Sequence, residues 1–188
     1  GEWYICMLAV RPQERFTTMG RETFLAKVTW ENDWPVVNPG VGMLTPTVDI
    51  DLPSWEEELG DRKLTDEQHY DFANMKDKLS FEWMSLRNPA DDLYEMNNGL
   101  LLKCNKVTLK EKATPSYLSI RQRHHNFEAS AILDITNLTS SNRAGIAYVQ
   151  SNEYHVRTEL SNNGINVILC EQGNDRVISS ARLENITK

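Results

Sequence analysis

Short β-prone segments separated by turn residues recur through most of this chain, and this recurrence constrains its fold more than any other feature. Asn162-Asn163-Gly164 and Gly173-Asn174-Asp175 supply tight turns between such segments, because Asn, Asp and Gly tolerate the left-handed backbone of a short hairpin loop. The pattern predicts strands at residues 79–86, 99–104, 116–120, 126–136, 144–149, 154–160, 165–171 and 176–183. Strands recurring about every 8–12 residues are typical of a sandwich. We therefore expect an all-β, antiparallel β-sandwich.

The first forty residues predict a smaller antiparallel unit. Residues 3–10 are almost continuously apolar without helical spacing, which predicts a buried strand. Residues 23–30 are β-prone, and Asn32-Asp33 supplies a turn after them. Proline and glycine then punctuate residues 38–65, and such a run predicts an irregular crossing between two domains.

Composition and charge exclude several classes of protein. Apolar residues are 40% and charged residues 25% of the chain, the balance of a soluble globular protein. No run approaches the roughly 18 apolar residues that a membrane span needs. The net charge is −7 and the basic residues are scattered, so we expect neither a nucleic-acid partner nor a membrane. Localisation stays open between cytoplasmic and exported.

The three cysteines do not predict a metal or disulfide framework. Cys6, Cys104 and Cys170 are far apart and lack CxxC spacing. We expect three buried thiols, since free cysteine is among the most buried residue types, and a single bridge stays an alternative.

Ordered motifs along the chain carry a family resemblance. The first part contains Glu2-Trp3-Tyr4, Leu8-Ala9-Val10-Arg11-Pro12, Gly20-Arg21-Glu22-Thr23-Phe24-Leu25 and Trp34-Pro35-Val36-Val37-Asn38 with Gly40. The second part contains Asp71-Phe72, Glu82-Trp83, Leu86-Arg87-Asn88-Pro89, Arg121-Gln122-Arg123-His124, Phe127-Glu128-Ala129, Ala144-Gly145-Ile146 and Tyr154-His155. Together they resemble glycoside hydrolase family 43, the β-xylosidases and α-L-arabinofuranosidases.

The resemblance implies a division of the chain. Residues 1–45 would be a remnant of the last blade of a five-bladed catalytic propeller, residues 46–69 an irregular linker, and residues 70–188 a concanavalin-like jelly-roll β-sandwich lacking its last strands. Such enzymes invert the anomeric centre with two carboxyl groups, one acting as acid and one as base. We expect no cofactor in this chain, and whether the missing propeller holds calcium stays open.

In family order the catalytic carboxylates precede the first matching segment, so we expect no catalytic residue in this chain. Whether the chain is an enzyme by itself stays uncertain on the sequence alone. Asp33, Asp49, Asp51 and the cluster Glu56-Glu57-Glu58 lie in a turn and in the expected linker. We expect those carboxylates to be solvated rather than to replace the missing pair.

The resemblance carries one residue to the sugar site, Arg21, whose guanidinium would hold carboxylates or sugar hydroxyls in an intact propeller. The alternative is that Arg21 and Glu22 neutralise each other.

Arg121, Gln122, His124 and His125 form a dense polar cluster in the second half. We expect it to be a satisfied polar network on the sandwich, and the alternative is that Arg121 and His124 are weaker sugar contacts. His124 and His125 would point to opposite faces of a strand, which argues against a metal site. The tryptophans Trp30, Trp34, Trp55 and Trp83 could stack on sugars, although core or interdomain packing is the favoured interpretation.

Two hypotheses follow. In the first, the chain is the C-terminal part of a family 43-like hydrolase acting on xylosides or arabinosides in plant polysaccharide breakdown, non-catalytic alone and supporting the propeller. In the second, it is a stand-alone sandwich for carbohydrate binding or protein assembly. Expected partners are a xylo- or arabino-oligosaccharide and either the missing propeller or a second copy. Because an incomplete propeller leaves apolar edges, residues 1–38 should join the sandwich sheet or mediate a homodimer.

Overall fold

The computed structural model describes residues 1–50, 67–75, 79–88 and 92–183. The chain divides into two compact units, Gly1–His69 with Gln122–His125, and Tyr70–Arg121 with Asn126–Lys188. Every regular element of the described ranges is a strand. None of those residues forms a helix of the length and apolarity that crossing a bilayer demands.

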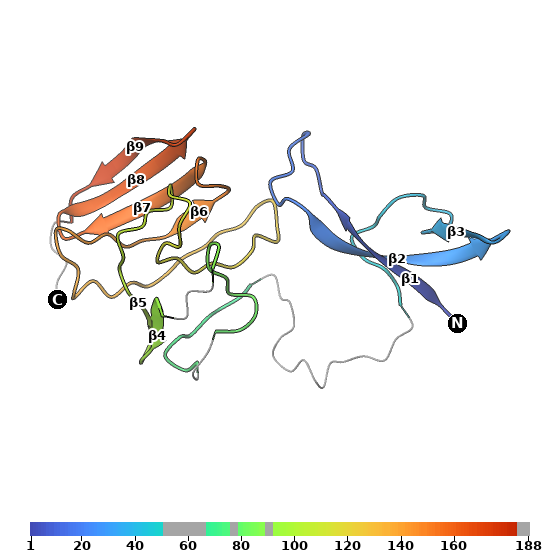
Figure 1. Cartoon of the computed structure of the whole chain (residues 1–188), viewed down its shortest axis with the longest axis horizontal. Helices are drawn as coiled ribbons and strands as arrows, with labels where there is room; N and C mark the ends of the chain where they lie inside the picture. Colours follow the sequence, from blue (N-terminus) through green and yellow to red (C-terminus); the bar gives the residue numbers. More distant parts are fainter. Residues whose placement is uncertain (51–66, 76–78, 89–91, 184–188) are drawn as a thin grey trace. The chain divides into compact units, whose positions relative to one another are not determined.

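The first unit contains an antiparallel sheet of three strands in the order β1-β2-β3 (Figure 1). The strands are β1 (Trp3–Ala9), β2 (Glu22–Glu31) and β3 (Trp34–Val37). The predicted turn between β2 and β3 is confirmed: Asn32 and Asp33 have φ values of 51° and 62°. Two successive left-handed residues are what a two-residue hairpin loop requires.

In this sheet only two residues, both on the middle strand, are buried. Ala26 and Val28 on β2 are 1% and 8% exposed, whereas Trp3 and Trp30 on the same face are 58% and 52% exposed. The two indole rings meet edge to face with centroids 5.8 Å apart. The prediction that residues 3–10 form a buried strand is therefore right in type and wrong in burial, because a three-stranded sheet covers little more than its centre.

The strands β1–β3 pair with one another. Both outcomes predicted for residues 1–38, joining the sandwich sheet and mediating a homodimer, stay predictions.

The second unit contains a two-stranded ladder and a four-stranded antiparallel sheet in the order β6-β7-β8-β9 (Figure 1). The ladder pairs β4 (Tyr94–Met96) with β5 (Leu100–Leu102). The larger sheet consists of β6 (Ala147–Val149), β7 (His155–Ser161), β8 (Gly164–Glu171) and β9 (Asn174–Ala181). The fold is thus all-β and antiparallel, as expected.

The hairpins of the larger sheet follow the turn residues closely. Asn162 and Asn163 alone separate β7 from β8, as predicted. The next turn consists of Gln172 and Gly173, with φ values of 51° and 75°, so it begins one residue earlier than the glycine suggested. A β-bulge between Val167 and Ile168 shifts the register of β8 against β9.

Three predicted strands do not form. Residues 79–86 and 116–120 meet in a single bridge between Met84 and Ser119, and residues 126–136 form no strand. Ile132 in the last segment is fully exposed. An alternating pattern makes a strand only where a neighbour supplies a run of backbone hydrogen bonds. The first two segments share only that bridge, and residues 126–136 pair with no strand among the described residues.

An aromatic cluster packs the start of the second unit. The Trp83 ring lies 5.0 Å from that of Tyr70 and 5.3 Å from that of Phe72, both nearly edge to face. The packing interpretation is therefore confirmed for Trp83. Trp55 lies outside the described residues.

Cysteine burial differs from the expectation. Cys170 is buried and free, as predicted, but Cys6 and Cys104 are exposed. Cys6 lies on an outer strand of the small sheet, and Cys104 follows the short ladder.

Candidate functional site

The carboxylate of Glu22, the residue after Arg21, forms its ion pair with Arg11. Arg11 donates from Nε to Oε2 of Glu22 at 2.8 Å and from Nη2 to Oε1 at 2.7 Å. This forked pair raises the pKa of the Arg11 guanidinium above its usual value. The alternative in which Arg21 and Glu22 neutralise each other is therefore not formed. Arg21 is exposed, and it has no ion pair among the described residues.

Arg11 also reaches a segment that is distant in sequence. Its Nη2 donates to the carbonyl oxygen of Arg123 at 2.8 Å, and Thr18 Oγ1 lies 3.4 Å from His125 Nδ1. The segment Gln122–His125 accordingly belongs to the first unit. The motif around Arg11 signalled ancestry, but no sequence spacing indicated this contact across 112 residues.

The predicted cluster around residues 121–125 is not on a strand. The argument that His124 and His125 point to opposite faces of a strand is therefore wrong in its premise. His124 is exposed, and its carbonyl oxygen accepts a hydrogen bond of 2.7 Å from Gln122 Nε2. Arg121 is exposed and belongs to the second unit.

The second unit contains a polar network that sequence reasoning missed. Arg157 donates from Nη1 to His155 Nε2 at 2.9 Å, from Nε to Glu159 Oε1 at 2.8 Å, and from Nη2 to Asp175 Oδ2 at 2.9 Å. Residues two apart on a strand share one face, and β9 brings Asp175 opposite Cys170, the partner of His155. The alternation of His155, Arg157 and Glu159 was the available signal.

The protonation states in this network follow from its contacts. The hydrogen bonds from Arg157 hold the pKa of Asp175 down at about 2. Burial lowers the pKa of His155 and raises that of Cys170. Because His155 Nε2 accepts from the guanidinium, the imidazole is neutral with its proton on Nδ1, 3.4 Å from the carbonyl oxygen of Ser151.

Three side chains of metal-binding type meet in the same place. Ligand atoms of His155, Cys170 and Asp175 all lie within 4.8 Å of one another. However, Arg157 already donates to the imidazole and to the carboxylate, and Lys110 lies 3.5 Å from the carboxylate. The lone pairs that a metal ion would need are thus already occupied by Arg157 and Lys110. These residues therefore fit a salt-bridge network better than a metal centre.

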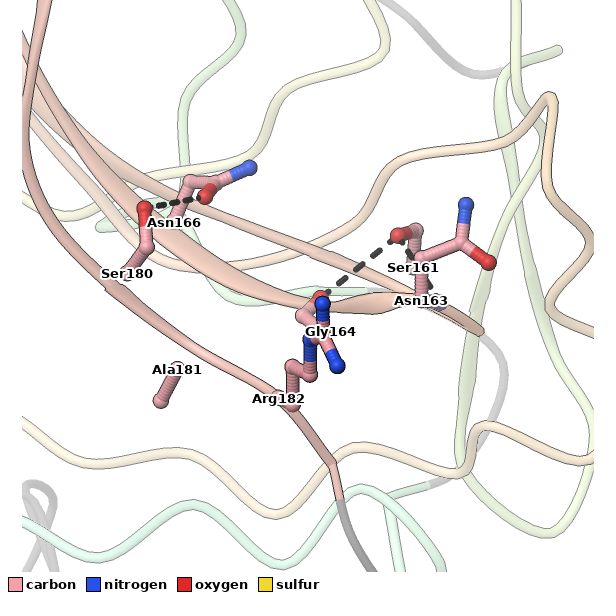
Figure 2. A pocket seen from close by; sticks show the side chains of 7 residues that line it. All are labelled: Ser161, Asn163, Gly164, Asn166, Ser180, Ala181 and Arg182. Atoms are coloured by element: carbon pink, nitrogen blue, oxygen red, sulfur yellow. Dashed lines mark hydrogen bonds between the residues drawn. The ribbon is translucent and has the colours of Figure 1, made fainter.

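A shallow hollow lies at one end of the larger sheet. Its volume is about 440 Å³, and Figure 2 shows its lining residues Ser161, Asn163, Gly164, Asn166, Ser180, Ala181 and Arg182. Ser180 donates to Asn166 Oδ1 at 2.7 Å. The lining has no aromatic ring, so it lacks the flat ring surface on which a sugar stacks.

Comparison with known proteins identifies the second unit. The family model of the beta xylosidase C-terminal concanavalin A-like domain matches residues 69–186. The chain belongs to this family. The resemblance to glycoside hydrolase family 43 is thereby confirmed, and the sandwich unit is a concanavalin-like domain of that family.

Family 43 relatives align with more than this domain. A xylosidase/arabinosidase of Butyrivibrio fibrisolvens is 40% identical over 166 residues, covering 83% of this chain and 30% of the relative. A non-reducing end alpha-L-arabinofuranosidase of Bacteroides ovatus is 29% identical over 82% of this chain and 29% of its own length. A xylan 1,3-beta-xylosidase of a Vibrio species is 24% identical over 96% of this chain and 37% of its own length. The chain thus spans about a third of the length of these relatives.

The acidic residues considered above as replacements for the catalytic carboxylates do not form a described cluster. Asp33 is exposed in the turn between β2 and β3, and Asp49 lies in a segment without regular structure. Asp51 and Glu56-Glu57-Glu58 lie outside the described residues. Asp33 and Asp49 therefore offer no paired carboxylates of the kind that inverting hydrolysis needs.

Proposed function

We propose that this chain is the C-terminal part of a family 43-like glycoside hydrolase that acts on xylosides or arabinosides in plant polysaccharide breakdown. In this proposal the chain has no bond-breaking role and supports the catalytic propeller. The observation that carries it is the match of residues 69–186 to the C-terminal domain of beta xylosidases, together with relatives of which the chain spans about a third.

We also propose the division of the chain that the resemblance implies. Residues 1–45 are the last blade remnant, residues 46–69 the linker and residues 70–188 the sandwich domain. The two compact units described above support this division. Most of the linker lies outside the described residues.

We infer that Arg21 is the sugar-site residue of this chain, with Arg121 and His124 as weaker sugar contacts. The support for Arg21 is its exposure and its freedom from Glu22, which Arg11 occupies. A guanidinium that is not already paired can bind carboxylates or sugar hydroxyls with forked hydrogen bonds.

The test has two arms. The chain alone should hydrolyse aryl β-xylosides and aryl α-L-arabinofuranosides no faster than buffer. A chimera in which this chain replaces the aligned segment of the Butyrivibrio fibrisolvens relative should be active, whereas the relative without that segment should not. Hydrolysis by the pure chain, or a chimera no better than the truncated relative, would overturn the proposal.

The role of Arg21 is tested in the same chimera. Arg21→Ala should reduce kcat/KM about tenfold or more, the worth of one or two hydrogen bonds from a charged donor. Arg15→Ala is the matched control, because Arg15 is an exposed arginine of the same β1–β2 connection. Equal rates for the two variants would remove Arg21 from the site.

The other expected partner is the missing propeller or a second copy of the chain. We propose that this partner covers the exposed face formed by Trp3, Ile5 and Trp30. These side chains are 58%, 38% and 52% exposed, more than a stable sheet normally leaves open on adjacent positions. Sedimentation of the chain alone distinguishes a homodimer from a monomer that awaits a propeller.

A further inference from the structure

We propose that Arg11 is a positioning residue that fixes the segment Gln122–His125 against the connection between β1 and β2. This role goes beyond the proposed hydrolase function and does not depend on it.

The Arg11 guanidinium binds two groups at once, the carboxylate of Glu22 and the backbone carbonyl of Arg123. Nε and Nη2 make a forked pair with the Glu22 carboxylate at 2.8 and 2.7 Å, and Nη2 also donates to the Arg123 carbonyl oxygen at 2.8 Å. Met19 Sδ lies 3.3 Å from the same Nη2. Nε has one N–H group and Nη2 has two, so the planar guanidinium can donate twice to Glu22 and once to the Arg123 carbonyl.

The contact between Arg11 and Glu22 is held in place by the first sheet. Glu22 is the first residue of β2 and pairs with Ala9, the last residue of β1. Arg11 follows Ala9 by two residues and is half-buried. Arg11 and Glu22 therefore both lie at the same end of the β1–β2 ladder. The register of the two strands holds them close enough to form the forked pair.

The contact between Arg11 and Arg123 involves a segment that is not part of any described strand. Residues 122–125 lie outside every strand of the described chain, so no register determines their place. The Arg11 contact with the Arg123 carbonyl and the Thr18 contact with His125 join them to the β1–β2 connection. The same connection ends at Arg21, directly before Glu22. His124 and Arg21 thus belong to the same compact unit.

Trypsin provides a direct test, because it must take the Arg123 side chain and carbonyl into its own active site to cut the Arg123–His124 bond. The contact with Arg11 occupies that carbonyl. We compare the rate of cleavage after Arg123, followed by mass spectrometry, in the natural chain and in Arg11→Gln. The matched control is Arg15→Gln, which removes the same charge from an exposed position of the same connection.

Cleavage after Arg123 should be about tenfold faster in Arg11→Gln, because the variant loses hydrogen bonds from a charged donor. Arg15→Gln should match the natural chain, and cleavage after Arg143, an exposed site in the second unit, should not change. Arg11→Lys should not restore protection, because a single ammonium keeps the charge but lacks the fork.

Three results would overturn the proposal. They are equal cleavage after Arg123 in Arg11→Gln and Arg15→Gln, a parallel rise after Arg143 that would indicate general unfolding, and full protection in Arg11→Lys that would reduce the role to charge. None of them bears on hydrolysis by the chimera, so the two proposals fail separately.

Discussion

Replacing Arg157 with methionine should destabilise the larger sheet more than any other single loss of charge in the described part of the second unit. Methionine keeps most of the apolar stem, which packs on the sheet, and removes all the donors. The change leaves His155 Nε2 and the carboxylates of Glu159 and Asp175 without the guanidinium that now contacts them.

The expected cost follows from burial. Breaking a fully buried ion pair costs about 3–5 kcal/mol, but the carboxylate side chains here are 25% and 34% exposed, against 15% for Arg157. Water can therefore rehydrate both carboxylates in part, whereas His155 is only 3% exposed and keeps an unsatisfied nitrogen. We expect the free energy of unfolding to fall by about 2–3 kcal/mol.

The measurement is urea unfolding followed by far-ultraviolet circular dichroism, with a transition fitted for each unit because two units need not unfold together. Hydrogen exchange of peptides from β7 and β8 assigns the affected transition. The control is Arg143→Met: Arg143 is 45% exposed and lies 4.0 Å from Glu159. An exposed pair of this kind contributes less than about 0.5 kcal/mol.

The reasoning fails if Arg157→Met costs less than about 1 kcal/mol, or if it costs no more than Arg143→Met. Either outcome would mean that solvent already screens the network and that the hydrogen bonds of Arg157 are worth little beyond those to water.

Three further outcomes are expected. Because the pKa of Asp175 is lowered from 3.8 to about 2 in the folded chain, its contribution is complete above pH 3.8 and is lost as the pH falls through 2; Asp175→Asn should therefore be less stable by about 1 kcal/mol at neutral pH, after allowance for solvent screening, and the difference should vanish near pH 2 in acid titrations. Gly145→Ala should lower the urea midpoint by the equivalent of about 2 kcal/mol or more, because its Cβ would lie 2.2 Å from a carbonyl oxygen of β7. In the native chain a thiol reagent should label Cys6 and Cys104 rapidly and Cys170 only on unfolding, and fast labelling of all three would contradict the described burial.

Hairpins were the part of the fold that could be predicted best. Asn32-Asp33 and Asn162-Asn163 separate their strands as the turn chemistry indicates, since a turn depends on the residues that form it. Residues 126–136 have an equally clear alternation and yet form no strand. An alternating pattern is compatible with a strand, but a strand also needs a neighbour, and alternation does not specify one.

The candidate site divides in the same way. Arg21 could be named from its motif, and its exposure beside β2 could not. Nothing in the sequence indicated that Arg11 rather than Arg21 would bind Glu22, or that the same guanidinium would reach Arg123.

By itself the sequence determined the all-β class, the main hairpins and the family, because each depends on short-range chemistry or on ordered motifs. Only the tertiary structure decided which charges meet. Arg157 contacts Asp175 across 18 residues and Arg11 contacts Arg123 across 112. Such pairs arise when strand register and segment packing bring distant residues within hydrogen-bond reach, and the energy of a charged pair depends on that distance and on the burial around it.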